Sequence, residues 1–244
     1  MGFTSGAGKS EGFVISLVVI GDGMKINETF YSLSGEGTSM GVPTIFVRLS
    51  GCNLDCTHCD TQYAQECKEE LSVSEIMSRL QLNPIAPLLI TGGEPLVQAD
   101  EVGNLVFATG RRRTEIETNG SIDPPSWFKD VDCWSVDVKC PSSGSYGSFK
   151  TKWLRRMRKR DQLKFVVGTL EDLDFVKGFL NGVILRPTVL ISPMASILLN
   201  KREGIIEEYW NREWLQEVAE FCKEQNVRMS LQLHKIIYGD VGGV

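Results

Sequence analysis

The chain has 244 residues, of which 42% are hydrophobic and 23% are charged, and its formal net charge is −5. This composition is that of an ordinary globular protein with one large core, so we expect one main domain. The negative net charge gives no general reason to expect nucleic-acid binding, and no apolar run approaches the ~20 residues that a transmembrane helix needs. The local basic runs at residues 111–113 and 150–160 are interpreted as solvated faces.

The seven cysteines indicate a reducing compartment. Their number is odd and three of them are clustered, whereas a secreted protein more often carries paired thiols. The apolar block at residues 13–20 is short and lacks the basic region and cleavage pattern of a signal peptide. We therefore predict a cytoplasmic protein with neither membrane nor nucleic acid as a partner.

The first 23 residues differ from the rest of the chain. They begin Gly- and Ser-rich and end directly before a second methionine, Met24. Residues 6–10 are not read as a phosphate-binding P-loop, because Phe3 occupies the position of its first glycine and no strand precedes it. We predict an N-terminal extension at residues 1–23, either a tail or the product of an upstream start, and one domain at residues 24–244.

Strands and helices alternate along this domain. Apolar and β-branched runs predict strands, and helical periodicity with capping residues predicts helices. The expected strands are residues 26–32, 44–49, 87–91, 114–117, 133–139, 162–167, 183–191 and 227–233. The expected helices are residues 73–82, with a capping box from Ser72 and Glu75, then 98–108, 171–180 and 206–225. The alternation indicates parallel βαβ units with right-handed crossovers, and about six units suggest an α/β fold of the partial (β/α)6 TIM-like barrel type.

Two charged residues near the start of the domain are candidates for ligand binding. Glu36 stands between Gly35 and Gly37, and glycines let the backbone come close to a bound molecule. The Glu36 carboxylate could then accept hydrogen bonds from N–H groups of that molecule. A plain turn explains the same residues. Arg48 is almost the only charge in a strand expected to be buried, so its planar guanidinium should meet an anion. That anion is either a ligand carboxylate or the partner in a structural ion pair.

The run Cys52-Asn-Leu-Asp-Cys56-Thr-His-Cys59 places three thiols on one loop. Such thiols can converge on a soft metal centre, because cysteine sulfur is a preferred ligand of iron–sulfur clusters and zinc. A closed zinc site or electron-transfer cluster normally takes four protein ligands, whereas three leave one metal position for something that is not protein. The alternatives are ordinary loop thiols, or a zinc knuckle that recruits His58 or Cys67 as its fourth ligand.

The CxxxCxxC spacing resembles the signature of the radical S-adenosylmethionine (SAM) superfamily. The resemblance implies a 4Fe-4S cluster held by Cys52, Cys56 and Cys59, with the fourth iron chelated by the amino and carboxylate groups of SAM. Gly92-Gly93-Glu94 follows a predicted strand and is similar to the superfamily's GGE motif, which binds the amino group of SAM. The implied chemistry is cleavage of SAM and hydrogen abstraction by the 5′-deoxyadenosyl radical, so no catalytic side chain is expected.

Six separated segments are together similar to the 7-carboxy-7-deazaguanine synthase family and occur in the family's order. They are residues 30–37, 46–52, 59–61, 117–120, 137–143 and 231–235. The resemblance implies a lyase that converts 6-carboxy-5,6,7,8-tetrahydropterin to 7-carboxy-7-deazaguanine by radical ring contraction with loss of ammonia, in queuosine or archaeosine biosynthesis. It also implies a homodimer and a flavodoxin or ferredoxin as the electron donor.

The resemblance assigns roles to individual residues as well. Thr61 would bind a Mg²⁺ ion that touches the substrate, since this hard ion prefers oxygen ligands. Arg48 would bind the substrate carboxylate. The other substrate-binding residues would be Leu33, Ser34, Gly35, Glu36, Thr91 and His234. The SAM-binding residues would be His58, Asp60, Gly93, Glu94, Glu117, Asp137, Lys139 and Ser192.

The chain departs from the family's pattern at two positions. Ser34 stands where the family often has glutamine, which removes one amide contact to the pterin. Ser192-Pro193 is matched to a Gln-Pro pair that the family usually has in a late strand.

Two other functions are open on the sequence. A glycyl-radical-enzyme activase of the same superfamily shares the cysteine spacing but acts on a protein, whereas Glu36 and Arg48 match a small carboxylated heterocycle. A non-enzymatic iron–sulfur or zinc protein would have a fourth protein ligand and would not cleave SAM.

Overall fold

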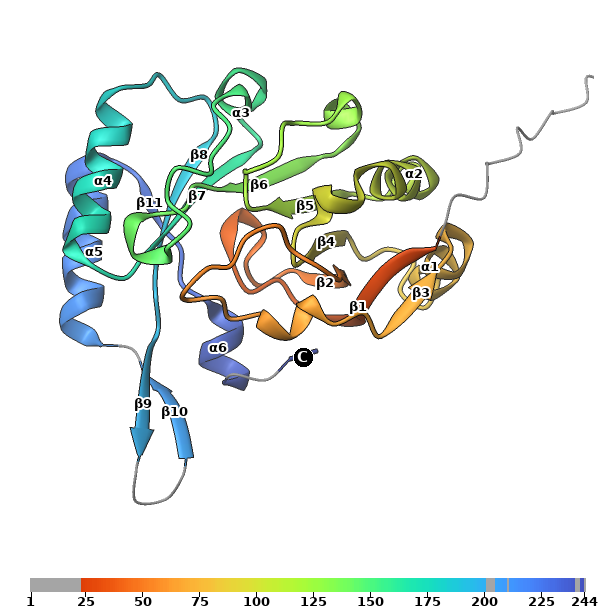
Figure 1. The fold of residues 1–244 in the computed structure, drawn as a ribbon, viewed down its shortest axis with the longest axis horizontal. Coiled ribbons are helices and arrows are strands. Elements are labelled where there is room, and N and C mark those ends of the chain that lie inside the picture. Colours follow the sequence, from red (N-terminus) through yellow and green to blue (C-terminus); the bar gives the residue numbers. More distant parts are fainter. Residues whose placement is uncertain (1–22, 201–204, 210, 240–241, 244) are drawn as a thin grey trace, which may run out of the picture.

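A nine-stranded sheet forms the centre of the computed structural model, with the strand order β11-β8-β7-β6-β5-β4-β2-β1-β3 (Figure 1). Its strands are β1 (Met24–Leu33), β2 (Pro43–Leu49), β3 (Glu69–Leu71), β4 (Leu88–Gly92), β5 (Thr114–Thr118), β6 (Cys133–Asp137), β7 (Gln162–Val167), β8 (Thr188–Pro193) and β11 (Arg228–Met229). A separate hairpin consists of β9 (Ser196–Asn200) and β10 (Ile205–Tyr209). The structure describes residues 23–200, 205–209, 211–239 and 242–243, so residues 1–22 of the predicted N-terminal extension lie outside it.

The sheet is parallel except at one edge. Strands β2, β4, β5, β6, β7, β8 and β11 pair in parallel, whereas β1 pairs antiparallel with both β2 and β3. The sheet ends at β11 and at β3 and therefore does not close on itself. This arrangement confirms the predicted α/β fold of the partial-barrel type.

The helices connect successive parallel strands, as the alternating pattern predicts. They are α1 (Val73–Leu80), α2 (Ala99–Thr109), α3 (Lys152–Arg156), α4 (Leu170–Asn181), α5 (Arg212–Gln225) and α6 (Leu233–Tyr238). Short 3-10 helices are η1 (Gly37–Ser39), η2 (Gln62–Gln65), η3 (Pro95–Gln98), η4 (Ser126–Asp130) and η5 (Pro141–Ser143). Helices α4 and α5 lie side by side next to the β8 and β11 end of the sheet (Figure 1). Among the helices of the described residues, none is both long and apolar enough to cross a membrane.

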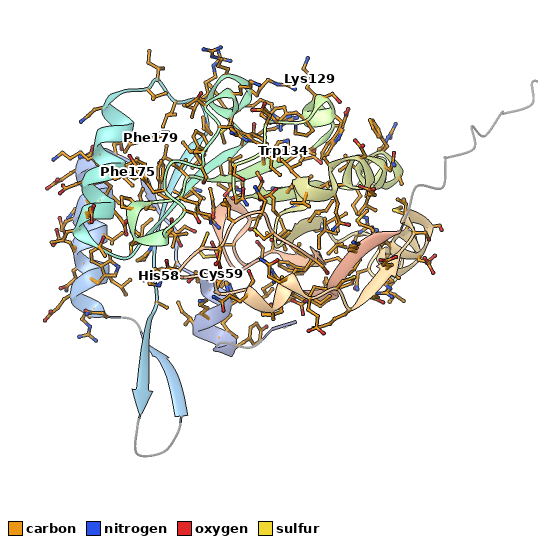
Figure 2. The ribbon with its side chains drawn as sticks, viewed as in Figure 1. His58, Cys59, Lys129, Trp134, Phe175 and Phe179 are labelled. Carbon is orange, nitrogen blue, oxygen red and sulfur yellow. The ribbon has the colours of Figure 1, made fainter. Side chains whose placement is uncertain are left out.

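Aromatic side chains fix the middle of the sheet. Trp134 on β6 is fully buried, stacks on Phe128 with ring centroids 5.5 Å apart, and donates its ring N–H to the Phe128 carbonyl over 2.9 Å. Phe175 and Phe179 lie one turn apart on α4 (Figure 2). Both pack edge-on against Phe165 of β7. Burying a large aromatic side chain contributes about 1.5–3 kcal/mol, so these contacts hold β6 and β7 firmly beneath the loops that follow them.

Three of the sequence expectations are wrong at their boundaries. The strand expected at residues 183–191 begins only at Thr188, because Pro187 has no N–H for a strand ladder. The helix expected at residues 206–225 begins at Arg212, since Asn211 accepts from two backbone N–H groups as the N-cap and residues 205–209 pair with β9 instead. The last strand contains only Arg228 and Met229, and α6 begins at Leu233.

The capping box at the start of α1 is confirmed and provides a test of the fold. The Ser72 side chain accepts from the Glu75 N–H, and the Glu75 carboxylate accepts from the Ser72 N–H over 2.8 Å. We expect Ser72→Ala to lower the free energy of unfolding by about 1 kcal/mol, because one helix donor loses its acceptor. The control is Ser78→Ala in the same helix, whose hydroxyl bonds only to the Ser74 carbonyl. Thermal unfolding followed by circular dichroism should separate the two variants, and equal melting temperatures would contradict the assignment.

Candidate active site in the cavity at the strand ends

A single cavity of ≈550 Å³ collects most of the predicted site residues. It lies where the segments after β1, β2, β4, β5, β6 and β8 meet the start of α6, as the rule for ligand sites in such folds predicts for the parallel strands. Figure 2 shows His58 and Cys59 side by side on the loop that follows β2. The predicted residues that line the cavity are Leu33, Ser34, Gly35, Glu36, Arg48, Cys52, Cys56, His58, Cys59, Asp60, Thr61, Thr91, Gly93, Glu117, Asp137, Lys139 and His234. Glu94 and Ser192 do not line it.

The cysteine loop faces the cavity with all three thiols. The Asn119 side chain donates to the Cys52 sulfur over 3.7 Å, the Cys56 sulfur lies 3.3 Å from the Ser145 hydroxyl, and the Cys59 sulfur lies 3.7 Å from the Thr61 hydroxyl. Burial raises the pKa of the Cys52 thiol.

The chemistry of this donor set fits a cluster better than one ion. Among the described residues, no three His, Cys, Asp or Glu side chains are arranged to hold a single metal ion. A 4Fe-4S cluster does not need such an arrangement, because each cysteine binds a different iron. N–H and O–H groups around cluster sulfurs stabilise their negative charge, and Asn119 provides one.

The loop after β4 packs directly on the backbone that leads into Cys52. A Cβ atom on Gly93 would lie 2.0 Å from the Gly51 carbonyl oxygen, so only glycine allows this approach. The Glu94 N–H donates to the same Gly51 oxygen over 2.8 Å. The backbone of Gly92 and Gly93 therefore lines the cavity next to the cysteine loop.

The Glu94 carboxylate points away from the cavity and is fully buried. It accepts from the Leu96 N–H over 2.9 Å, the Thr118 hydroxyl over 2.8 Å and the Asn119 N–H over 2.6 Å. Burial raises its pKa to about 7, although these three donors oppose the shift. In the structure, Glu94 thus joins the β4 loop to the β5 loop rather than facing a ligand.

A charged network crosses the floor of the cavity. Lys164 on β7 donates to the Glu36 carboxylate over 3.0 Å and lies 3.4 Å from Oδ1 of Asp137. The other carboxylate oxygen of Asp137, Oδ2, accepts from Lys139 over 2.9 Å. Burial alone would raise the pKa of Asp137, but Lys139 and Lys164 outweigh it and lower that pKa. The predicted substrate residue Glu36 and the predicted SAM residue Asp137 therefore share one lysine.

Sequence reasoning missed Lys164. It is a lone charge in an otherwise apolar strand, which is the same signal that identified Arg48.

Glu117 and Thr91 form a pair on neighbouring strands. The Thr91 hydroxyl donates to the Glu117 carboxylate over 2.8 Å, and burial raises the pKa of Glu117. The sequence assigned Glu117 to SAM and Thr91 to the substrate. In the structure the two side chains are hydrogen-bonded to each other, so they line the cavity together.

The start of α6 closes the cavity from the opposite side. The Gly35 carbonyl accepts from the Leu233 N–H over 2.8 Å, and a Cβ atom on Gly35 would lie 2.0 Å from the His234 ring. Gln232 donates to the carboxylates of Glu36 over 3.1 Å and Asp60 over 3.3 Å. Burial lowers the pKa of His234. Gln232 lies within the matched segment 231–235, although the resemblance assigns it no role.

Arg48 lines the cavity and also has a protein partner. Its Nε donates to the Glu28 carboxylate over 2.7 Å. Of the two possibilities that the sequence left open, the ion pair is present, and the guanidinium still lies at the cavity wall.

Ser192 is buried in β8, and its hydroxyl has no hydrogen-bond partner among the described residues. The neighbouring residues Val166 and Met194 reach the cavity instead. The structure therefore does not bring the predicted late-strand SAM contact to the other site residues.

Comparison with known proteins defines the class first. Residues 46–132 match the family model described as the Radical SAM superfamily, and this span contains the cysteine loop and Gly92-Gly93. Together with the partial barrel and the cavity, the match defines a radical SAM enzyme, a class that uses a 4Fe-4S cluster and SAM.

The relatives then define the particular family. A 7-carboxy-7-deazaguanine synthase of Methanospirillum hungatei is 37% identical over 88% of this chain and 86% of its own length, and one of Thermoplasma acidophilum is 34% identical over 91% and 100%. The fold is similar to the crystal structure of QueE from Escherichia coli, with a TM-score of 0.64 and 23% identity over 87% of this chain and 95% of that one. The chain belongs to the 7-carboxy-7-deazaguanine synthase family.

The buried Glu94 carboxylate gives a test of how the site is held together. In Glu94→Gln one oxygen becomes an NH₂ group that faces N–H or O–H donors, so we expect the free energy of unfolding to fall by about 1–3 kcal/mol. The matched control is Glu224→Gln, an exposed position on α5. Thermal unfolding measures the difference, and a Glu94→Gln melting temperature equal to that of the control would show that the three hydrogen bonds do not stabilise the fold.

Proposed function

We propose that this chain converts 6-carboxy-5,6,7,8-tetrahydropterin to 7-carboxy-7-deazaguanine with loss of ammonia, in a deazapurine pathway such as queuosine or archaeosine biosynthesis. The observation that carries this proposal is that one cavity contains the three-cysteine loop on one side and Glu36 with Arg48 on another. A carboxylate and a guanidinium are the groups expected to recognise a guanidine-like ring edge and a carboxylate on one small molecule. Membership of the family supports the same reaction.

Cys52, Cys56 and Cys59 would hold the 4Fe-4S cluster, and the metal position that they leave open would take SAM. The bound cluster and SAM supply the 5′-deoxyadenosyl radical that removes hydrogen from the substrate. His58, Asp60, Gly93, Asp137 and Lys139 line the cavity and are proposed SAM contacts. Glu94 would act through the loop that it fixes.

Arg48 would bind the substrate carboxylate and Glu36 would accept from the pterin N–H groups. Thr61 lies next to Cys59 in the cavity, so a Mg²⁺ ion bound by its hydroxyl would touch the substrate close to the cluster. Leu33, Ser34, Gly35, Thr91 and His234 would complete the pocket, and Glu117 would act through Thr91.

The protein's task in this reaction is to position and enclose its ligands. The substrate loses the elements of ammonia to give the product, so the conversion itself needs no net oxidant. Lys164 pairs with both Glu36 and Asp137 in a buried setting, which keeps the two carboxylates oriented as acceptors. His234 packs against Gly35 and forms part of the wall of the cavity. A flavodoxin or ferredoxin is the proposed electron donor, and a homodimer is the proposed assembly.

Turnover tests the proposed function. We expect anaerobically reconstituted protein with SAM, a reductant, Mg²⁺ and 6-carboxy-5,6,7,8-tetrahydropterin to form 5′-deoxyadenosine and a deazaguanine carboxylate, both measured by liquid chromatography with mass detection. The control omits the pterin. Formation of 5′-deoxyadenosine without consumption of the pterin would refute the substrate assignment, and no SAM cleavage would favour a non-enzymatic iron–sulfur protein.

Arg48→Lys tests the carboxylate contact. A point charge cannot reproduce the planar fork of arginine, so we expect KM for the carboxylated pterin to rise about tenfold or more while the cluster absorbance is unchanged. The control is Arg79→Lys, because Arg79 forms a similar pair with Glu69 outside the cavity. An Arg48→Lys enzyme with the KM of the wild type would count against the contact.

A further inference from the structure

Glu28 and Arg48 face each other across the antiparallel edge of the sheet. They are direct partners in the β1–β2 register, and the register shifts between Ile26 and Glu28. The shift places Glu28 and Arg48 opposite each other on the same face of the sheet. A register one residue different would turn one of the two side chains to the other face. The Arg48 side chain is 14% exposed and the Glu28 side chain is 16% exposed, so water screens the ion pair only partly.

Aromatic residues enclose this pair on both sides. The Arg48 guanidinium carbon lies 5.9 Å from the Phe30 ring centre and 5.7 Å from the Tyr63 ring centre. Phe30 in turn stacks on Phe46 with ring centroids 4.6 Å apart. The Tyr63 hydroxyl donates to the Glu28 carboxylate over 3.1 Å, on the same oxygen that accepts from Arg48 Nε. Burial raises the pKa of Tyr63 to about 12, so it is a donor at neutral pH.

The nitrogen atoms of the Arg48 guanidinium differ in their hydrogen bonds. Nε is used by Glu28, and among the described residues neither Nη atom donates a hydrogen bond. Arg48 and Tyr63 line the cavity, whereas Glu28 does not. The Nη atoms of Arg48 are therefore left for an acceptor outside the protein, while Glu28 stays outside the cavity lining.

We propose that Glu28 and Tyr63 are positioning residues that hold Arg48 with its Nη edge toward the carboxylate of the substrate. The inference rests on the proposed function, since it assumes that Arg48 binds a carboxylate. An arginine side chain has several rotatable bonds, and fixing it before binding removes an ordering cost from the binding step. Glu28 anchors Nε, Tyr63 anchors Glu28, and the two rings limit the tilt of the guanidinium plane.

The experiment compares four variants of the reconstituted holoenzyme. Glu28→Ala removes the anchor, Glu28→Gln keeps an oxygen that can accept from Nε and from Tyr63, and Tyr63→Phe removes only the hydroxyl. Glu69→Ala is the control, because it breaks the ion pair with Arg79 outside the cavity. For each variant we would measure kcat and KM, the melting temperature, the cluster absorbance, and calorimetric binding of the carboxylated pterin and of a tetrahydropterin that lacks the carboxylate.

We expect Glu28→Ala to raise KM and Kd for the carboxylated pterin by roughly tenfold, with a much smaller change in kcat. Glu28→Gln should recover most of the affinity, Tyr63→Phe should lose roughly threefold, and Glu69→Ala should bind like the wild type. Affinity for the pterin that lacks the carboxylate should change in none of them. A merely structural role would instead change melting temperature and binding of both pterins together.

The outcomes that overturn the inference differ from those that overturn the proposed function. If Glu28→Ala and Tyr63→Phe bind the carboxylated pterin as tightly as the wild type while Arg48→Lys does not, the positioning role is wrong and the proposed function stands. Tighter binding by Glu28→Ala would mean that Glu28 competes with the substrate. If the wild type binds neither pterin, the proposed function is wrong and the inference falls with it. Should Glu28→Ala fail to fold, Glu28→Gln and Tyr63→Phe still decide between these outcomes.

Discussion

One buried carboxylate holds together the loops on which the site depends. Glu94 accepts from Leu96, Thr118 and Asn119, and so connects the ends of two parallel strands. The Asn119 side chain continues the chain of hydrogen bonds to Asn53 and to the Cys52 sulfur. An unpaired carboxylate in this position would cost several kcal/mol, and full satisfaction of its oxygens makes the arrangement rigid instead. The cluster loop therefore takes its position from a residue that does not reach the cavity.

The second constraint is charge balance in a poorly screened space. Lys164 pairs with Glu36 and with Asp137, and Lys139 pairs with Asp137, so each carboxylate has a cation that offsets the cost of burial. Lys164 is shared between the two carboxylates, which links the part of the cavity proposed for the pterin to the part proposed for SAM.

The sequence could predict this fold well because local signals agreed with the global arrangement. Apolar runs marked the buried strands, and the strand-to-loop junctions marked the cavity wall. The helix predicted at residues 206–225 wrongly includes residues 206–209, which form part of a hairpin. Their pattern of apolar and acidic residues fits a helix as well as a strand, and periodicity over so few residues cannot separate the two. The partner of Glu28 could not be predicted, since the register of neighbouring strands decides which side chains meet. The direction of Glu94 could not be predicted either, because a motif gives only the type of a residue and its hydrogen-bond partners come from the distant residues Thr118 and Asn119.

The two halves of the cavity come from different parts of the sheet. The cysteines, Gly93, Asp137 and Lys139 follow parallel strands, the arrangement common to the class that the family model describes. Glu36 follows β1, the antiparallel strand between β2 and the edge strand β3, and Arg48 is held from β1 by Glu28. Glu36 and the anchor of Arg48 thus come from an antiparallel addition to the parallel sheet. Arg48 itself, Thr91 and the residues proposed for radical chemistry lie on the parallel strands or on the loops that follow them, so the proposed pterin site joins the two parts of the sheet.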